Sequence, residues 1–331
     1  MPEIKGPKTC DVWLPNQCML RCKMCYLWKG DAVPYKEAVT LKIEDYKKIF
    51  CDLKDLVDDS FSVSFGGGEP LLEFDLLRSI AEICSEMDFK TYFPTNAYLI
   101  DDAMAEKIKE AKISSIGISL ESMDKSVHDN IRGKRGSWDR IMKAIECLSN
   151  NCHGIFTNIL TVIMAENLEG IIELTKWVYN HPKLFGINFQ AVQTPFNSVC
   201  PENWRELDEY ADIWPRDIRK VRSVIDELIR LKQTHGKDNF KIGNSITQLE
   251  LFKLYFDDPR SFVKPDRCHL GDVISIDSLG NIRTCYEMGP IGNIREQNIR
   301  DIWYSKKAEG IRSRIYNCDK NCYHLINCYY G

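Results

Sequence analysis

The sequence predicts an α/β protein in which a partial (βα)6, TIM-like barrel precedes a small cysteine-rich α+β domain. Between residues 10 and 192, six short β-rich runs alternate with longer amphipathic segments, and parallel strands can be joined only by crossovers of that kind. After Cys268 the pattern changes to two alternating runs around Leu279-Gly280-Asn281, which predict a hairpin. Five cysteines accompany this second pattern.

Each strand of the barrel is expected to lead into a helix. The strands are expected at Cys10–Leu14, Phe61–Phe65, Lys90–Pro94, Ser115–Leu120, Phe156–Ile163 and Phe185–Val192. The segments between them carry apolar residues three and four positions apart, as at Leu41, Tyr46, Ile49, Phe50 and Leu53, which indicates a buried helical face. In such barrels the loops after the carboxyl ends of the strands carry the chemistry.

Beyond the sixth strand the chain is expected to form a connector and a second domain. The predicted parts are a barrel (1–195), a helical connector or lid (196–262) and a cysteine-bearing domain (263–331). The stretch Thr194–Trp214 is rich in Pro, Asn and Trp, and we expect it over the barrel mouth. Helices are expected at Asp217–Lys232 and Thr247–Phe256, where apolar residues recur at helical spacing.

Charge and hydropathy exclude several classes of protein. The 331 residues include Lys+Arg 44 and Asp+Glu 48, a formal net charge of −4, and no polybasic segment marks a dedicated nucleic-acid binder. No stretch approaches the roughly 18 apolar residues of a membrane span, and the amino terminus lacks the apolar core of a signal peptide. We therefore expect a cytoplasmic protein that acts without nucleic acid or membrane.

The chain contains 14 cysteines in an uneven arrangement. Their share is below the roughly 8 to 10% of a disulfide scaffold, and close-spaced thiols in a reducing compartment bind metal more often than they pair. Cys18, Cys22 and Cys25 lie in the loop after the first strand. A second set lies near the end of the chain: Cys268, Cys285, Cys318, Cys322 and Cys328. The scattered cysteines are interpreted as small apolar core residues.

Three thiols in the first set leave a structural zinc site incomplete, because such a site takes four ligands. Only Cys10 lies within short reach as a fourth ligand, at a spacing unlike that of a zinc ribbon. Three thiolates suit a 4Fe-4S cluster, in which one iron stays open for a substrate or cofactor. Zinc is the alternative.

The segment Cys18-x3-Cys22-x-Met24-Cys25-Tyr26 resembles the signature of the radical S-adenosylmethionine (radical SAM) superfamily, and Gly66-Gly67-Gly68-Glu69-Pro70 is similar to its Gly-Gly-Glu-Pro segment. The resemblance implies a SAM-binding 4Fe-4S cluster on the three cysteines and a carboxylate, Glu69, that receives the methionine ammonium. It further implies cofactor contacts from Met24, Tyr26, Gly67, Gly68, Pro70, Thr95, Asn96, Ser119, Arg132, Asn158 and Val192. Ser119 and Arg132 are expected at the cofactor's ribose and carboxylate; a helix cap and a solvated arginine are the plainer alternatives.

The carboxyl-terminal cysteines, with Gly280, Gly292-Asn293-Ile294 and Ile302-Trp303, resemble the SPASM/twitch extensions of radical SAM enzymes. The resemblance implies one auxiliary 4Fe-4S cluster held by Cys268 and Cys285 together with two of Cys318, Cys322 and Cys328. Which two is left open by the sequence. The alternative is a structural zinc knot on Cys268, Cys285, Cys318 and Cys322.

The resemblance implies reductive cleavage of SAM to a 5′-deoxyadenosyl radical that abstracts a hydrogen atom from the substrate. Because only seventeen residues precede Cys18, we expect a small polar metabolite, of amino-sugar or cyclitol type, that is oxidised or epimerised. A one-electron donor such as flavodoxin or ferredoxin is the expected partner. The alternatives are a peptide or protein maturase, acting on ribosomal peptides or sulfatases, and a non-catalytic metal-binding interaction module.

Two further residues are candidates for proton or hydrogen transfer. Cys200, in the loop expected over the barrel mouth, could donate a hydrogen atom, although an idle thiol is the plainer interpretation. Glu287 could act as a base. Tyr286 stands directly after Cys285, where the sulfatase-maturing branch has an acidic residue, so Glu287 is one position displaced.

Overall fold

The computed structural model describes residues 5–14, 17–28, 40–195, 198–234, 241–263 and 268–327. Within these ranges one nine-stranded sheet runs in the order β6-β5-β4-β3-β2-β1-β7-β8-β9. Its strands are β1 Thr9–Trp13, β2 Ser62–Gly66, β3 Lys90–Thr95, β4 Ser115–Ser119, β5 Phe156–Ile163, β6 Gly186–Ala191, β7 Val273–Ile276, β8 Asn281–Arg283 and β9 Gly292–Asn293. All six predicted barrel strands are confirmed to within one residue at either end.

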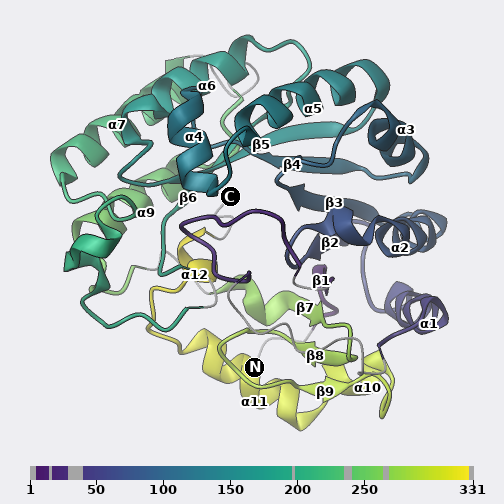
Figure 1. The fold of residues 1–331 in the computed structure, drawn as a ribbon. Helices are drawn as coiled ribbons and strands as arrows, with labels where there is room; N and C mark the ends of the chain where they lie inside the picture. Colours follow the sequence, from purple (N-terminus) through teal and green to yellow (C-terminus); the bar gives the residue numbers. More distant parts are fainter. Residues whose placement is uncertain are drawn as a thin grey trace.

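Most of the helices lie outside the curved sheet and leave its inner face toward the centre of the molecule, whereas the short α12 is drawn near that centre (Figure 1). They are α1 Ile43–Lys54, α2 Phe74–Glu86, α3 Asp102–Glu110, α4 Lys125–Arg132, α5 Ser137–Asn151, α6 Ile171–Asn180, α7 Ile218–Thr234, α9 Ile246–Asp257, α10 Ile299–Trp303, α11 Lys306–Tyr316 and α12 Tyr323–Asn327. The two predicted connector helices are confirmed as α7 and α9. No described helix is both long and apolar enough to cross a membrane.

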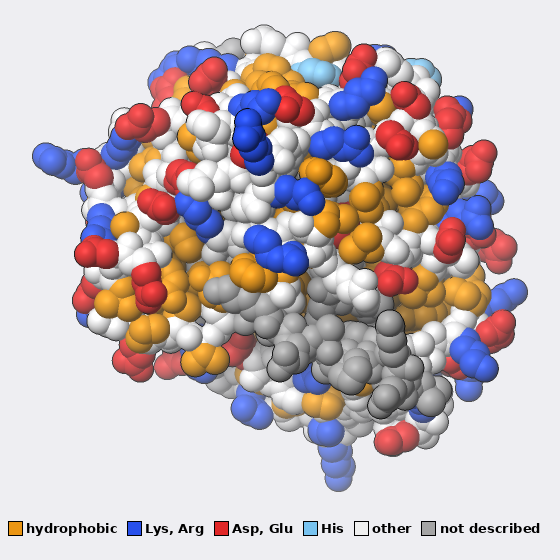
Figure 2. Space-filling model, viewed as in Figure 1, with side chains coloured by type: hydrophobic (Ala, Val, Ile, Leu, Met, Phe, Trp, Pro, Cys, Tyr) orange, Lys and Arg blue, Asp and Glu red, His pale blue; other side chains and the backbone are white. Residues whose placement is uncertain are grey.

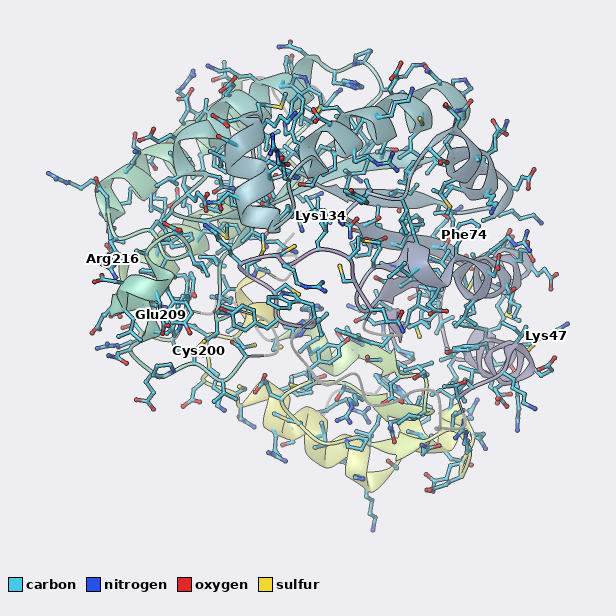
Figure 3. The ribbon with its side chains drawn as sticks, viewed as in Figure 1. Lys47, Phe74, Lys134, Cys200, Glu209 and Arg216 are labelled. Atoms are coloured by element: carbon cyan, nitrogen blue, oxygen red, sulfur yellow. The ribbon has the colours of Figure 1, made fainter. Side chains whose placement is uncertain are left out.

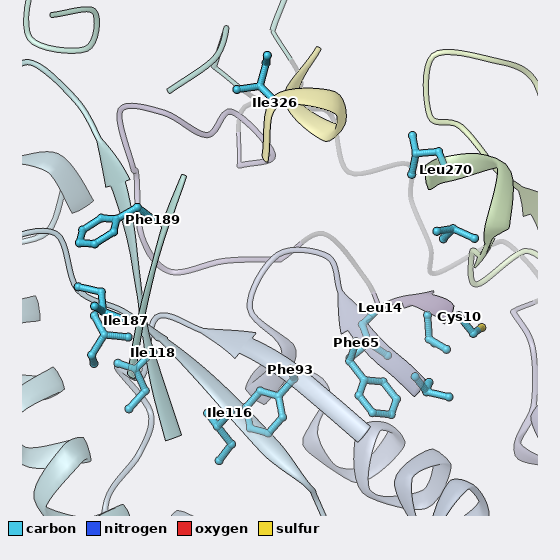
Figure 4. Close-up of a cluster of buried hydrophobic side chains, with 14 of the residues drawn as sticks. Cys10, Leu14, Phe65, Phe93, Ile116, Ile118, Ile187, Phe189, Leu270 and Ile326 are labelled. Atoms are coloured by element: carbon cyan, nitrogen blue, oxygen red, sulfur yellow. The ribbon is translucent and has the colours of Figure 1, made fainter. Parts of the chain in front are cut away.

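Side chains alternate between the two faces of the barrel strands, as the pleat requires. The face packed on the helices is apolar and fully buried, and Figure 4 shows part of this core, including Phe65, Phe93 and Ile116. The opposite face holds many polar residues and is partly exposed, with Asp11 beside Ser64 in the register and with Leu160 and Val162 of β5 among its apolar members. The parallel barrel thus has an apolar outer layer and a more polar inner face.

Strand β1 joins the barrel to the carboxyl-terminal hairpin. It pairs in parallel with β2 on one side and β7 on the other, so that Asp11 lies opposite both Ser64 and Ser275. Tyr286, just beyond β8, reaches the same place. Its hydroxyl accepts from Trp13 Nε1 at 2.5 Å and donates to Asp11 Oδ2 at 3.2 Å. The two halves of the chain therefore share one sheet and one hydrogen-bond network.

Carboxyl-terminal residues cover the far edge of the sheet, at β6. The Asn327 side chain donates from Nδ2 to the Ala191 carbonyl at 3.0 Å and accepts the Ala191 amide at 2.7 Å. Beside it, the Ile187 amide donates to Lys241 O at 2.7 Å and Gly243 N donates to Ile187 O at 2.8 Å. The edge strand is thus paired along its length, which removes an exposed row of backbone groups.

The segment expected as a lid or connector contacts the loop that carries the first cysteines. Trp204 and Trp214 anchor it, since both side chains are buried. Lys23 Nζ lies 2.7 Å from Glu166 Oε2, in the loop after β5, and 2.9 Å from Asp212 Oδ2 of the segment. Three loops at the carboxyl ends of the strands are therefore held together. The predicted domain boundaries themselves stay a prediction.

Asp11→Asn is expected to stabilise the apoprotein at neutral pH. Burial raises the pKa of Asp11 from its ordinary 3.8 to about 6, and the hydrogen bond from Tyr286 lowers it by a smaller amount. A pKa difference of about two units between the folded and unfolded states changes the free energy of unfolding by at most about 3 kcal/mol. Because the folded state prefers the protonated acid, wild type loses this stability as pH rises from about 4 to about 6. Asparagine keeps the acceptor without the charge.

Chemical denaturation of both proteins between pH 4 and pH 8 measures the difference. The variant should be more stable above pH 6 and equal to wild type near pH 4. Asp59→Asn, at an exposed position, is the control and should give no such pH-dependent gain. A pH-independent difference for Asp11→Asn contradicts the assignment.

Candidate functional site

The first cysteine set lies on a loop that crosses the centre of the barrel, seen in purple in Figure 1. Two backbone hydrogen bonds fasten it to the end of α4: Arg21 N donates to Arg132 O at 3.1 Å, and Lys23 N donates to Ile131 O at 2.9 Å. Gly133, which ends α4, packs so closely that a Cβ there would lie 2.2 Å from Arg21 O. The loop is therefore held rigidly over the strand ends.

The three thiols are sheltered and already receive hydrogen bonds. Cys18 Sγ accepts from Leu20 N at 3.5 Å and from Asn96 Nδ2 at 3.6 Å, and Cys22 Sγ accepts from Arg132 Nη1 at 3.5 Å. Burial raises the pKa of Cys25 to about 11 and that of Cys18 above its usual value. Such thiols deprotonate when a metal centre binds them. A sheltered trio with N–H donors aimed at sulfur fits an iron-sulfur cluster.

Glu69 lies at the carboxyl end of β2, only 2% exposed. Its Oε1 accepts from Thr95 Oγ1 at 2.6 Å and from Leu71 N at 3.1 Å, and its Oε2 accepts from Asn96 N at 2.8 Å. These donors favour the ionised carboxylate, although burial raises the pKa of Glu69. The predicted residues Glu69, Thr95 and Asn96 are thus brought together beside Cys18.

Gly67 allows the chain to turn between β2 and Glu69. Its φ is +124°, and a Cβ would lie 2.5 Å from Leu14 O, so any other residue would strain both strands. Pro70 follows Glu69 and opens the short 3₁₀ helix Pro70–Glu73. The glycine run therefore serves the close approach of backbone at the site, and not only a turn.

Arg132, at the end of α4, is 9% exposed and has partners within the protein. Its Nη2 donates to Glu121 Oε1 at 2.7 Å and its Nη1 donates to Cys22 Sγ. Its Nε is buried and has no hydrogen-bond partner among the described residues. The plainer alternative, a solvated arginine, is wrong. The unpaired N–H is the fit that a cofactor carboxylate requires.

The sequence places Glu121 in the matching segment Ser119-Leu120-Glu121 but assigns it no role. The feature of the sequence that could have indicated a role for Glu121 is the position of an acidic residue directly after an apolar strand. Ser119 itself ends β4 and is half-buried. On the neighbouring strands, Asn158 lies on the inner face of β5, while Val192, after β6, is buried and accepts the Tyr255 hydroxyl at its carbonyl at 3.1 Å.

Met24 and Tyr26 belong to the cysteine loop and are half-buried. Met24 packs against the core, and the Tyr26 ring meets the Trp28 ring edge-on with centroids 6.2 Å apart. The remaining glycine of the motif, Gly68, lies between Gly67 and Glu69 and is half-buried. Asn158, the third residue of β5, lies toward the amino ends of the strands, whereas the other predicted cofactor contacts fall on the cysteine loop or at the carboxyl half of the barrel.

The second cysteine set lines a cavity of about 150 Å³ in the carboxyl-terminal part. Four thiols from distant positions converge on it: Cys268, Cys285, Cys318 and Cys322. Burial raises the pKa of Cys322 to about 11 and that of Cys285 above its usual value. Four cysteines around one cavity fit a fully ligated iron-sulfur cluster. The fifth candidate, Cys328, lies outside the described residues.

The two residues considered for hydrogen or proton transfer lie apart from each other. Cys200 is half-buried, with Sγ 3.2 Å from Ser198 Oγ and 3.3 Å from Tyr210 OH. Figure 3 labels it on the outer segment, to the left of the cysteine loop. Glu287 lines the carboxyl-terminal cavity. Among the described residues, no three Cys, His, Asp or Glu side chains converge on the position of a single metal ion.

The sequence is similar to those of several known proteins. An AdoMet-dependent heme synthase of Methanosarcina barkeri is 26% identical over 293 residues, which cover 86% of this chain and 79% of that protein. The subtilosin biosynthesis protein AlbA of Bacillus subtilis is 31% identical over 220 residues, 61% of this chain and 46% of AlbA. The PqqA peptide cyclase of Granulibacter bethesdensis is 26% identical over 171 residues, 52% of this chain and 44% of the cyclase.

The fold is similar to that of Streptococcus suis SuiB bound to S-adenosylmethionine, with a TM-score of 0.68 and 23% identity over 99% of this chain and 73% of SuiB. The family model of the radical SAM superfamily matches residues 14–178, and that of the SPASM iron-sulfur cluster-binding domain matches residues 268–329. The chain therefore belongs to the radical SAM superfamily, with a SPASM-type domain after its barrel and with S-adenosylmethionine and 4Fe-4S clusters as its cofactors.

Proposed function

We propose that this radical SAM enzyme oxidatively modifies a peptide. The observation that carries the proposal is the placement of both cysteine sets on one sheet: the first follows β1, the second brackets the β7–β8 hairpin, and β7 pairs with β1. Two redox centres on adjacent strands suit a reaction that removes a hydrogen atom and then an electron from one substrate. The peptide class is supported by AlbA and the PqqA peptide cyclase.

When bound, the cofactors supply the 5′-deoxyadenosyl radical that no side chain can generate. In the proposed arrangement Cys18, Cys22 and Cys25 ligate the first cluster and Glu69 receives the methionine ammonium. The Arg132 Nε–H would donate to the methionine carboxylate, since this buried nitrogen at the cysteine loop has no partner among the described residues. Ser119, Asn158 and Val192 line the path of the nucleoside across β4 to β6.

The auxiliary cluster is proposed on the four cysteines of the carboxyl-terminal cavity. Arg314 and Lys320 also line this cavity, and their positive charges offset those of the thiolates. Glu287 lines it as well, so a role for Glu287 as a base requires that the substrate approach the auxiliary cluster.

A basic surface near the cysteine loop supports an acidic electron donor such as flavodoxin or ferredoxin. Lys134 Nζ lies 4.5 Å and Arg140 Cζ lies 5.4 Å from the centre of the Tyr98 ring. Tyr98 N donates to Asn96 Oδ1, and Asn96 in turn contacts Cys18. Figure 2 shows several Lys and Arg side chains near the centre of this face.

A tetrapyrrole carrying propionates is the second candidate substrate. It is favoured because the AdoMet-dependent heme synthase matches over most of its own length, whereas this chain covers less than half of AlbA and of the PqqA cyclase. The small polar metabolite expected from the sequence has less support than either. Epimerisation through Cys200 also has less support, because that thiol is engaged with Tyr210.

Anaerobic reconstitution should give about eight irons per chain, in two 4Fe-4S clusters. The variant with Ala at Cys18, Cys22 and Cys25 should hold about four, and so should the variant with Ala at Cys285 and Cys318. Cys51→Ala removes an exposed thiol outside both sets and should keep about eight. Iron and sulfide analysis measures the outcome, and about four irons in wild type would leave the carboxyl-terminal cysteines without a cluster.

Glu69→Gln should weaken SAM binding by ten- to a hundredfold, because a charged hydrogen bond to the ammonium contributes about 1.5 to 3 kcal/mol. Isothermal titration of the reconstituted protein measures the affinity. Glu82→Gln, on the exposed face of α2, is the matched control. Equal affinities of Glu69→Gln and wild type would remove Glu69 from the cofactor site.

The proposed reaction can be tested by coexpression with short reading frames from the same genomic region, followed by mass spectrometry of the peptides. Loss of two hydrogens from one peptide, absent with Cys22→Ala, is the expected result. Fe-coproporphyrin III is offered to the same enzyme. Loss of carbon dioxide and two hydrogens from a propionate, with all peptides unchanged, would establish the second candidate and refute the first.

A further inference from the structure

Glu121 is held by hydrogen bonds to both its backbone and its side chain. Its backbone N–H donates to His128 Nδ1 at 3.2 Å, and its carbonyl accepts from Asn167 Nδ2 at 2.9 Å. Its carboxylate Oε2 accepts from Val162 N at 2.9 Å, and Oε1 accepts from Arg132. Backbone and side chain are thus fixed by three segments of the chain. The position of the negative charge is fixed with them.

His128 adds to this rigidity without adding charge. It is fully buried, and burial lowers the pKa of its imidazole to about 3. The ring is therefore neutral, and its Nδ1 acts as an acceptor for the Glu121 amide. The charges in this buried cluster are those of Glu121 and Arg132.

Arg132 links this buried cluster to the first cysteine set, because its guanidinium contacts both Glu121 and Cys22. A guanidinium stays protonated in proteins, and the Nη2 and Nη1 of Arg132 contact Glu121 Oε1 and Cys22 Sγ. Burial raises the pKa of Glu121, yet Arg132 and the Val162 amide both donate to its ionised form. The pair is therefore a fixed dipole whose positive end touches the Cys22 sulfur.

We propose that Glu121 sets, through Arg132, the reduction potential of the cluster held by Cys18, Cys22 and Cys25. A positive charge and an N–H donor at a ligand sulfur stabilise the reduced, more negative cluster. Glu121 partly cancels that charge and so moderates the effect. Because both side chains are shielded from water, the interaction is stronger than at the surface. Glu121 is a positioning and charge-setting residue and does not touch the cofactor.

This inference goes beyond the proposed function, because it depends on the first cluster and on no substrate. It predicts opposite effects for the two partners. Arg132→Gln removes the cation and should lower the potential, whereas Glu121→Gln removes the opposing anion and should raise it. Arg132→Lys keeps the positive charge and should remain closer to wild type than Arg132→Gln.

The experiment is an EPR-monitored redox titration of the reconstituted holoenzyme without substrate, in which the signal of the first cluster is the one that is missing from the variant with Ala at Cys18, Cys22 and Cys25. Each of the two Gln variants should change the reduction equilibrium at least tenfold, about 59 mV for one electron. Lys125→Gln is the matched control: Lys125 begins the same helix, is exposed and pairs with Asp139. Its potential should equal that of wild type.

Iron content is measured on the same samples. Full iron with shifts of opposite sign supports the proposal. Full iron with no shift, or with shifts of the same sign, overturns it. Loss of the first cluster's iron from both Glu121→Gln and Arg132→Lys also overturns it, since the pair would then only hold α4 against the cysteine loop. None of these outcomes depends on whether the substrate is a peptide.

Discussion

The parallel pairing of β1 with both β2 and β7 is the constraint on which the rest of the molecule depends. The first strand of the chain is an inner strand of the sheet, between the barrel and the carboxyl-terminal hairpin. The cysteine loop leaves its carboxyl end, where the loops of parallel strands meet. Because the hairpin pairs with the same strand, both cysteine sets are tied to one sheet, the first after the carboxyl end of β1 and the second beside the amino end of β7.

The site also meets a strict electrostatic condition. A buried charge is tolerated only when it is paired or hydrogen-bonded. Glu69 meets this condition through Thr95 and Asn96, and Arg132 meets it through Glu121. The same contacts that remove the cost of burial also fix each group in place, so the site is preorganised before a cofactor arrives.

The sequence predicted the features that depend on local pattern. The six barrel strands follow from runs of β-branched and aromatic residues, and the cysteine loop and glycine run follow from their spacing. The choice of Cys318 and Cys322 as cavity-lining thiols was left open by the sequence, because it depends on how α11 packs on His269–Asp272 and how α12 packs on α9 and β6. The contacts of Tyr286 with Asp11 and Trp13 join residues more than 270 positions apart, which no local periodicity encodes. The role of Glu121 could not be predicted for the same reason, since its partners come from three separate segments.

Two hydrogen bonds between the Asn327 side chain and the Ala191 backbone join α12 to the sixth strand. Cys322 directly precedes α12, and Asn327 ends that five-residue helix. This short helix thus connects a thiol of the carboxyl-terminal cavity to the far edge of the barrel. Because α12 has only five residues, the position of Cys322 is linked to that of the Asn327–Ala191 contact, which couples the carboxyl-terminal cavity to the edge strand of the barrel.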